Sequence, residues 1–488
     1  MRSLRLIALL AIPAQLAFAQ QQNPTSQGAP LALDEAIQTA QRNNPSLAQT
    51  RSNVGNADAQ VRQARGALFP QLSASAFSRV TQAGTQYQFG VAFPTQGSVQ
   101  SQYALNLNYN ISAGLAFAPK AAKATRAAAE ADVASSTELV RATVTQQYIT
   151  ALQAEATAAV LDTLVTVAQG QLDLANAKVA VGAGTIIDVR AAEVSLGQAQ
   201  VNALTQHNLA RVNRLQLYQT MGVPADIDAN LTTRFAVAAP TFSLDSVLDL
   251  ARRVNPDVRA RQSRQAASQA NLQLARTNYL PTLQLSTGYA ANAFGYSDNN
   301  YLPSQAIKSQ FGKFTNCMFL DSLRSATGLP TDPCGSPTLT TDSLARIRGS
   351  NQPFHFTSSP LYLQAFVSVP IFNGFQREAQ IEQNRVARDN ATLDLRARNL
   401  QLTTDVTQAY LNLVTTAKTA ELQTQIAAKA AEDLALNQES YKVGAKTFLD
   451  VTTANATYQK AQIDRINAIY EYHKAFATLE NAIGRPLR

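Results

Sequence analysis

The sequence predicts a mostly α-helical chain that also carries β-strands suited to cross a membrane. Three observations support this: an N-terminal export signal, long helical patterns that occur twice, and four segments in which apolar and polar residues alternate. The 488 residues are 45% apolar and 15% charged, which is typical of a folded chain rather than a disordered one.

Composition and motifs exclude several classes of function. The chain has 41 Lys and Arg against 33 Asp and Glu, and no basic cluster that would mark a nucleic-acid surface. Three His and two Cys are too few for most metal centres. His207, His355 and His473 are scattered without triad spacing, and no Gly-rich nucleotide loop with Lys occurs. We therefore expect no enzyme activity, cofactor, metal or nucleic-acid partner.

The first residues predict export. Two arginines precede an apolar stretch over residues 6–16. The small-x-small sequence from Ala17 to Ala19 follows it. This predicts a signal peptide over residues 1–19, followed by an N-terminal extension over 20–30. Beyond it, no run of ~18 uninterrupted apolar residues occurs, so we expect no membrane-spanning helix. A secreted protein, a soluble periplasmic protein and an outer-membrane barrel all remain compatible with this pattern.

Two sets of motifs occur twice at constant offsets. The stretch Leu33-Asp34, Asn44-Pro45, Ala64-Arg65, Pro70 recurs as Leu244-Asp245, Asn255-Pro256, Ala275-Arg276, Pro281, and the turn Val-Gly-Ala-x-Thr-x-x-Asp occurs at 181–188 and 443–450. The repetition predicts a first repeat over 31–235, a linker over 236–241 and a second repeat over 242–488. The second repeat carries an insertion at about 291–358.

Helical periodicity dominates each repeat. Apolar and small residues between Val406 and Leu434 recur at alternating spacings of four and three, which predicts a coiled-coil seam, and residues 161–179 show the same pattern. The uninterrupted pattern from about Pro119 to Val181 would be ~95 Å long as a helix. We expect an elongated bundle in which shorter helices, 45–66 and 187–221, lie beside the long one.

Strand periodicity is strongest over residues 103–111, where Tyr, Leu and Ile alternate with Gln, Ala and Asn. Similar alternation occurs over 72–77, 283–289 and 361–371. Segments of ~10 residues match tilted transmembrane strands. A half-buried soluble sheet is the alternative, but four such segments on an exported chain favour the membrane.

Four strands cannot close a membrane barrel, because the smallest bacterial barrels have ~8 strands and lipid-facing main chain needs partners. The chain must therefore oligomerise. Polar Asn106, Asn108 and Asn110, facing inward, favour a trimer with twelve strands and an open lumen over a dimer with eight.

Three features together carry a family resemblance: the doubled motifs, the glycine after the second strand of each repeat (Gly114 and Gly374) and the two Val-Gly turns. On these features the chain resembles the TolC family of outer-membrane efflux channels. The resemblance covers about Leu31 to Leu487. It implies a homotrimer with a twelve-stranded barrel among outer-membrane lipids and a long antiparallel coiled-coil helical barrel extending into the periplasm of a Gram-negative-type bacterium. It also implies two partners, a periplasmic adaptor of the membrane fusion type and an inner-membrane transporter.

The two Val-Gly turns resemble the surface on which adaptor hairpins dock in this family. As plain helix ends they would need no such role. The residues that match the docking motif are Val181, Gly182, Gly184, Thr185, Val443, Gly444 and Thr447.

Asp450 matches the position of a cation-selective pore constriction in the family. The alternative is a favourable interaction with the helix dipole. Thr453 stands where some relatives carry a second acidic residue, so we expect weaker cation selectivity or an acidic ring supplied elsewhere.

Three further residues match positions that hold the tip closed in relatives. The resemblance implies a hydrogen bond between Tyr441 and Asp188 and a similar locking role for Lys446. Opening would then be an iris-like movement of the second hairpin.

Cys317 and Cys334 lie in the insertion, among Gly, Pro and Ser. Two cysteines in one exported loop indicate a structural disulfide, which stabilises by ~3 kcal/mol in the loop-entropy model. The alternative is a redox role for the pair. The position of this loop between two predicted strands places the insertion at the extracellular mouth.

These features together predict a passive outer-membrane exit duct of a tripartite efflux pump or type I secretion system. The alternative from another class is a structural or adhesive coiled-coil protein anchored by a barrel. A secreted hydrolase would need a nucleophile with a positioned base, and the sequence offers no such constellation.

Overall fold

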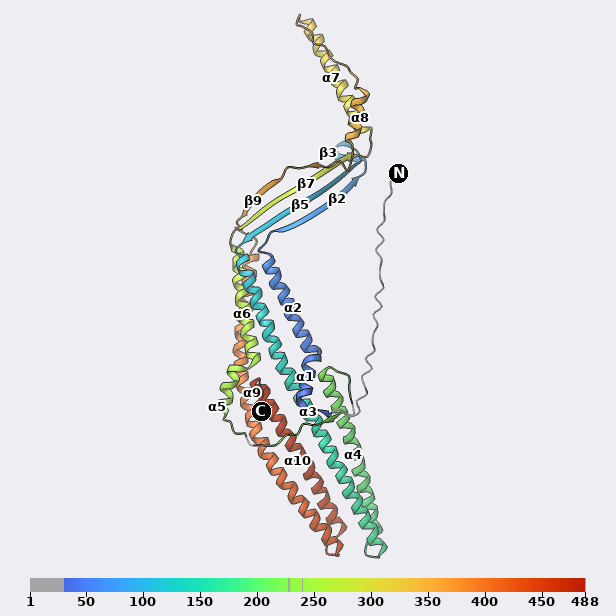
Figure 1. Ribbon diagram of the computed structural model, residues 1–488, viewed down its shortest axis with the longest axis vertical. Helices are drawn as coiled ribbons and strands as arrows, with labels where there is room; N and C mark the ends of the chain where they lie inside the picture. The colour runs from blue at the N-terminus through green and yellow to red at the C-terminus, as the bar shows by residue number, and fades with distance from the viewer. Residues whose placement is uncertain (1–29, 227–228, 239, 488) are drawn as a thin grey trace. The chain divides into compact units, whose positions relative to one another are not determined.

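The computed structural model describes residues 30–226, 229–238 and 240–487. The predicted signal peptide and all but the last residue of the predicted extension lie outside the described residues. The order of the main elements in the first half of the chain recurs in the second (Figure 1). The first set is α1 Leu33–Asn43, α2 Pro45–Gly66, β2 Gln71–Thr81, β5 Ser98–Ser112, α3 Gly114–Ala180 and α4 Ile186–Met221. The second set is α5 Leu244–Val254, α6 Pro256–Arg276, β7 Thr282–Tyr296, β9 Tyr362–Ser368, α9 Gln376–Lys442 and α10 Phe448–Ile483.

Further short elements join these sets, and the sequence pattern had not predicted them. The hairpin strands β3 Gly84–Gln88 and β4 Val91–Thr95 lie between β2 and β5, and β1 Pro30–Leu31 pairs in parallel with β6 Asn230–Leu231. The insertion contains α7 Tyr301–Ala326, α8 Thr341–Ser350 and β8 Thr357–Ser358, and the short helix η1 Thr277–Tyr279 follows α6.

The chain divides into two compact units that do not coincide with the two predicted repeats. The first unit comprises Met1–Asn53, Glu130–Ala260 and Arg396–Arg488, and the second comprises Val54–Ala129 and Arg261–Leu395. Each unit therefore takes segments from both halves of the sequence. The repeat boundaries remain a prediction.

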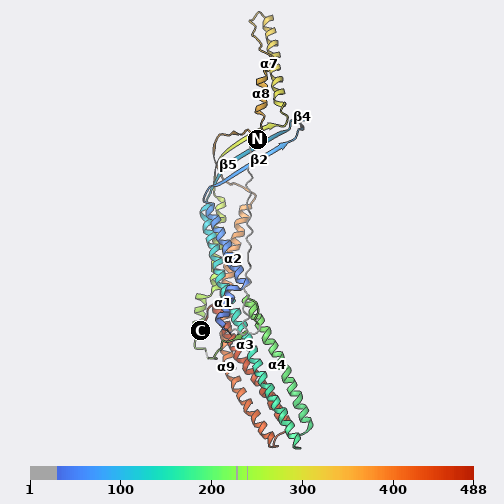
Figure 2. The same cartoon turned by 45° about the vertical axis from the view of Figure 1, so that its right-hand side comes forward.

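The first unit is built from two long helical hairpins. Within this unit α4 lies alongside α3 and α10 lies alongside α9 (Figures 1 and 2). Residues of the predicted seams are buried: Leu164 is 2% exposed, Ala168 is 1% exposed and Leu413 is fully buried. Small residues at these positions let neighbouring helices approach closely.

The Asn-Pro sequence that occurs in each half of the chain has a packing explanation in this unit. Asn44 donates from Nδ2 to the carbonyl of Thr220 at 2.8 Å, and Asn255 donates in the same way to Ala482 at 2.9 Å. The Oδ1 atom of each asparagine accepts a backbone N–H from the first turn of the helix that follows it. Each asparagine thus caps one helix and binds the end of another.

The glycines that end α4 and α10 lie against these same Asn-Pro segments. Gly222 and Gly484 have φ angles of 75° and 87°, which favour glycine. A Cβ on Gly222 would lie 2.5 Å from the Asn43 carbonyl oxygen, and one on Gly484 would lie 2.3 Å from Cδ of Pro256. Each copy of the doubled motif therefore makes the same close contact, between a glycine at a helix end and an Asn-Pro segment.

Helix α3 begins at Gly114, so Pro119 lies inside it rather than at its start. Proline cannot donate to the carbonyl four residues earlier. Pro119 lies near the start of this 67-residue helix, so the missing hydrogen bond affects only its first turns.

On length and composition alone, α3 is also long and apolar enough to cross a membrane. Its best 18-residue window has a mean hydropathy of 1.2 and is 44% buried within the structure. The expectation that no helix of this chain could span a bilayer was therefore too strict, because it counted only uninterrupted apolar runs. Tyr148 and Val144 of this helix are fully buried in the core of the first unit.

The second unit contains a five-stranded sheet. Strands β2, β5 and β7 are neighbours in that order, and β7 also pairs with β8 and β9. All these pairs are antiparallel. Strand β9 ends at Ser368, shorter than the predicted 361–371, because Pro370 cannot donate a ladder hydrogen bond.

Candidate functional site

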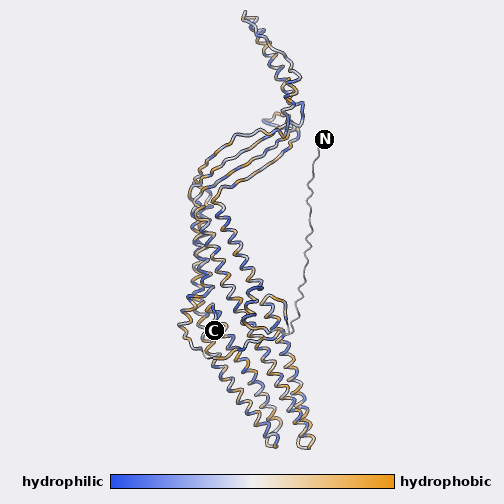
Figure 3. The backbone as a smooth tube through the Cα atoms, viewed as in Figure 1, coloured by the Kyte–Doolittle hydropathy of each residue, from blue (hydrophilic) through white to orange (hydrophobic). Residues whose placement is uncertain are grey.

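The sheet of the second unit has one apolar and one largely polar face. Residues directly opposite one another point to the same face, and Leu105 lies opposite Tyr289 while Asn106 lies opposite Ser73. Figure 3 shows hydrophobic and hydrophilic residues alternating along these strands. The apolar face includes Leu72, Tyr103, Leu105, Leu107, Leu285 and Leu363, and the polar face includes Ser73, Gln102, Asn106, Asn108, Gln284 and Gln364.

The apolar face is not covered by the chain itself. Leu72 is 66% exposed, Leu105 46% and Leu363 81%. Within the described residues, β2 and β9 each pair with one neighbour, so their outer edges carry unpaired main-chain groups. An exposed apolar face and two open edges indicate that this sheet is completed by other molecules.

The second candidate site lies at the ends of the two helical hairpins in the first unit. The turns 181–185 and 443–447 join α3 to α4 and α9 to α10. Gly182 and Gly444 adopt φ angles of 72° and 78°, and the valines that precede them, Val181 and Val443, are 77% and 79% exposed. The structure thus places all the residues predicted to dock an adaptor in these two turns.

Identical capping boxes begin the helices that leave the two turns. The Thr185 backbone donates to Oδ2 of Asp188 at 3.1 Å, and the Asp188 backbone donates to Oγ1 of Thr185 at 3.3 Å. Thr447 and Asp450 repeat the arrangement at 2.8 and 3.3 Å. The recurring Thr-x-x-Asp is therefore explained locally by helix capping.

The Asp450 carboxylate also accepts a bond from the Thr447 hydroxyl at 2.7 Å. Hydrogen bonds from the side chain and backbone of Thr447 lower the pKa of Asp450, and the charge of Lys446 lowers it further. The carboxylate thus stays ionised at neutral and mildly acidic pH. Thr453, one turn on, donates its hydroxyl to the Leu449 carbonyl at 2.9 Å.

The predicted tip lock is only partly assembled within one chain. Tyr441 is buried, and burial followed by the charge of Asp188 raises the pKa of its phenol. Among the described tip contacts, the structure records no hydrogen bond between the Tyr441 hydroxyl and Asp188. Lys446 is exposed.

A lysine that the sequence had not singled out joins the two hairpins instead. The ammonium of Lys178, in the last turn of α3, lies 3.7 Å from the centroid of the Tyr441 ring and donates to the Tyr441 carbonyl oxygen. Phe448 adds an apolar contact, since it packs against the buried cluster of Ala175, Val189 and Ala192. The signal in the sequence was a basic residue at a helix C-terminus, which is too common to indicate a partner.

A buried pair of amides lies farther along the same interface. Asn455 of α10 donates from Nδ2 to Oε1 of Gln171 in α3 at 3.4 Å. Both side chains are buried, yet Nε2 of Gln171 and Oδ1 of Asn455 have no hydrogen-bond partner. Buried polar atoms without partners weaken an interface.

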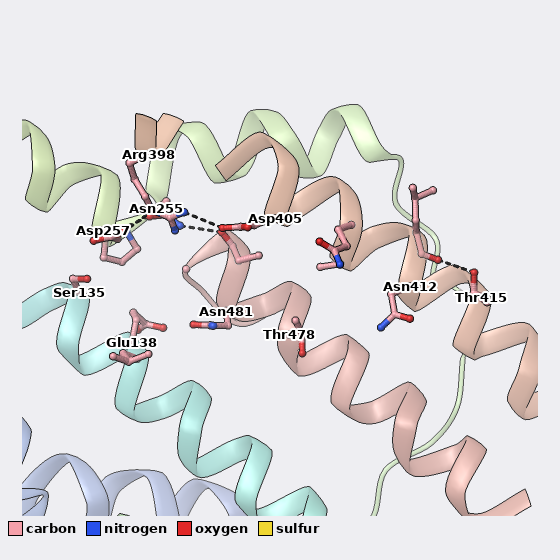
Figure 4. Close-up of a pocket in the computed structure, with 17 residues that line it drawn as sticks. Ser135, Glu138, Asn255, Asp257, Arg398, Asp405, Asn412, Thr415, Thr478 and Asn481 are labelled. Atoms are coloured by element: carbon pink, nitrogen blue, oxygen red, sulfur yellow. Dashed lines mark hydrogen bonds and ion pairs between the residues drawn. The ribbon is translucent and has the colours of Figure 1, made fainter. Parts of the chain in front are cut away.

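One cavity of the first unit, of about 890 Å³, is lined by both polar and apolar residues (Figure 4). Arg398 lies on its wall and bridges Asp257 at 2.5 Å and Asp405 at 2.9 Å. The single guanidinium is shared by the two carboxylates, so this part of the wall keeps a net negative charge. Within the part of the chain that the structure describes, no group of three or more metal-binding side chains occurs.

The insertion contains a disulfide between Cys317 and Cys334, whose Cα atoms are 5.7 Å apart. It joins α7 to the segment that precedes α8.

Two long helical hairpins in one unit and a sheet with an exposed apolar face in the other are features of outer-membrane channel subunits. Residues 36–223 and 337–485 match the family model described as outer membrane efflux protein. The chain therefore belongs to the outer membrane efflux protein family. It is located in the outer membrane and is the exit duct of an efflux pump.

Relatives and solved structures agree with this assignment. The outer membrane efflux protein BepC of Brucella suis is 27% identical over 93% of this chain and 85% of its own length. The outer membrane protein VceC of Vibrio cholerae has a TM-score of 0.67 at 17% identity, over 93% of this chain and 97% of its own. The open-state outer membrane channel MtrE of Neisseria gonorrhoeae has a TM-score of 0.67 at 18% identity, over 93% and 89%.

Proposed function

We propose that three copies of this chain form one passive duct through the outer membrane. The observation that carries the proposal is the sheet with an exposed apolar face, a polar face and two open edges. Pairing the β2 edge of one copy with the β9 edge of the next would satisfy the unpaired main-chain groups, which lipid cannot do. Three copies give twelve long strands, with the apolar face toward lipid and the polar face toward a water-filled lumen.

The helical hairpins of the first unit would form the periplasmic part of the duct. Their exposed turns at 181–185 and 443–447 are the surface we propose for a periplasmic adaptor, through which an inner-membrane transporter would be joined. The duct itself performs no chemistry. The transporter would supply both the energy and most of the substrate selectivity, whether in an efflux pump or in type I secretion.

Asp450 would form the selective constriction. Three ionised carboxylates around a threefold axis would attract cations and repel anions. The lowered pKa of Asp450 and its position at the exposed second tip support this role. Its cap on α10 holds the carboxylate in one place, so the two roles are compatible.

The insertion, with its disulfide, would lie at the extracellular mouth. It follows β7 and precedes β9, at the strand ends opposite those that lead into α6 and α9. Disulfides persist in such oxidising surroundings.

Planar-bilayer recording tests the duct. We expect discrete conductance steps with cation selectivity from the purified protein, and a larger conductance after Lys178→Met. A barrel-anchored structural or adhesive protein would give no steps in either form. Absence of steps from material whose folding is confirmed by circular dichroism would reject the duct.

A further inference from the structure

Helix α7 in the insertion has one side covered by its own chain. The disulfide joins Cys317 to Cys334, Gln310 donates to the Ser336 carbonyl at 3.1 Å, and Asp321 accepts from the backbone of Asp332 at 3.0 Å. All three helix residues lie on one side of α7, because their spacings of seven and four match the helical repeat. The segment that returns from α7 is thus fixed against that side.

The rest of the α7 surface carries two lines of exposed apolar side chains, one on the flank of the fixed side and one opposite it. Phe311 and Met318, seven residues apart, are 58% and 51% exposed. Phe319 and Leu323, four residues apart, are 62% and 49% exposed and lie on a second line. A contiguous exposed apolar surface of this kind is typical of a site that contacts another molecule.

Small residues separate the two lines. Thr315 and Ser322 fall between them in the helical projection. Their hydroxyls donate to the carbonyls of Gly312 and Phe319, at 3.0 and 2.7 Å, so they need no bond to water. Two apolar lines flanking a strip of small residues would let one helix contact a neighbour on each side.

The base of α7 is fixed to the end of β7. Asn351 accepts from the Tyr296 backbone N–H at 2.6 Å and donates to the Tyr296 carbonyl at 2.9 Å. The rings of Tyr296 and Tyr301 are 4.6 Å apart. Because Tyr296 ends β7 and Tyr301 begins α7, the direction of the helix follows that of the strand.

We propose that α7 packs against α7 of two other copies of this chain and that the three helices form a collar beyond the strand ends. The inference rests on the proposed trimer, in which copies joined at their strand edges hold three β7 ends on one rim. Every copy then presents the same two apolar lines at the same height. Lys308 lies about one turn nearer the strand ends than Phe311. Three helices that converge as they leave a ring of strands are farthest apart at this level, so the charge of Lys308 stays outside their contact.

Site-specific photocrosslinking tests the collar in the full-length protein within the outer membrane. A benzophenone amino acid replaces Phe311 in one variant and, as the matched control, exposed Lys313 on the other side of α7 in a second variant. We expect crosslinked dimers and trimers of the chain when the benzophenone stands at position 311, and no such products when it stands at position 313. The disulfide stays intact in both.

The oligomeric state of each variant, measured by native mass spectrometry, separates the two proposals. An intact trimer that gives no chain-to-chain crosslink at 311, equal crosslinks at both positions, or crosslinks only to lipid or to another protein would overturn the collar. A single subunit would overturn the proposed trimer, and the collar with it.

Discussion

The ammonium of Lys178 lies over the ring of Tyr441, 3.7 Å from its centroid, and so joins the hairpin α3–α4 to the hairpin α9–α10. The same ammonium donates to the Tyr441 carbonyl. The contact uses the face of the ring, not its hydroxyl. It therefore identifies a link between the hairpins different from the one that the family resemblance implies.

We predict that Lys178→Met weakens the closed tip. The substitution keeps an apolar side chain of similar length but removes the cation–π contact, worth about 0.5–2 kcal/mol, so the open population should rise by roughly 2- to 30-fold. Single-channel conductance is the measurement. Lys442→Met is the control, because Lys442 pairs with Glu439 of its own helix at an exposed site.

The two models of the lock differ at Tyr441 itself. If the ring face makes the link, Tyr441→Phe should conduct like the wild type and Tyr441→Leu should open more often. Opening by Tyr441→Phe combined with Lys446→Ser, with no effect of Lys178→Met, would favour the hydroxyl and Lys446 instead.

The buried amides Gln171 and Asn455 give a prediction of the opposite sign. Replacing both by leucine removes two polar atoms without partners, and such exchanges are often neutral or stabilising. We expect the double variant to close more tightly, with fewer openings and an unchanged or raised melting temperature. Asn455→Ala alone should destabilise, by about 1–3 kcal/mol, because it leaves the Gln171 amide without its partner. A double variant that opens more often than Asn455→Ala would contradict this account.

Asp450 should control ion selectivity over a wide pH range. Its folded pKa lies below the ordinary value, so the charge persists as pH falls to that value and is lost only at still lower pH. Reversal potentials in a salt gradient should therefore show steady cation preference down to about pH 4. Asp450→Asn should reduce the preference, whereas Asp188→Asn, which alters the matching cap on α4, should not. Equal effects of the two variants would reject the constriction at Asp450.

The glycines at the helix ends should tolerate no side chain. In Gly484→Ala the new Cβ would meet Pro256 at 2.3 Å with a φ of 87°, and Gly222→Ala meets the same kind of obstacle. We expect each to lower the yield of folded protein and its melting temperature. Gly55→Ala is the control, since nothing lies within 4 Å of its Cβ and alanine favours a helix by about 1 kcal/mol. A Gly484→Ala protein as stable as the wild type would show that the contact with Pro256 is loose.

Local patterns were enough to predict the main elements. The helix predicted over 45–66 is α2, the alternating segments 72–77, 103–111 and 283–289 lie in β2, β5 and β7, and β9 covers residues 362–368 of the segment predicted over 361–371. These elements depend on periodicities of 3.6 and 2, which neighbouring residues reveal by themselves. The family predicted from the doubled motifs was confirmed by the match of residues 36–223 and 337–485 to the outer membrane efflux protein model.

Other features depended on information that the pattern lacks. The β3–β4 hairpin turns at Phe89 and Gly90, with φ angles of 52° and 79°, and phenylalanine is not a residue that marks such turns. Gly312 lies inside helix α7, where glycine is unfavourable. Lys178 meets Tyr441 only after two hairpins distant in sequence come together. The roles of the tip residues remain predictions.

Native mass spectrometry of the full-length protein, extracted from the outer membrane in detergent, tests the central claim most directly. The account predicts a complex of three chains that stays together until the strand edges separate. A stable single subunit that remains dissolved in water without detergent would contradict it.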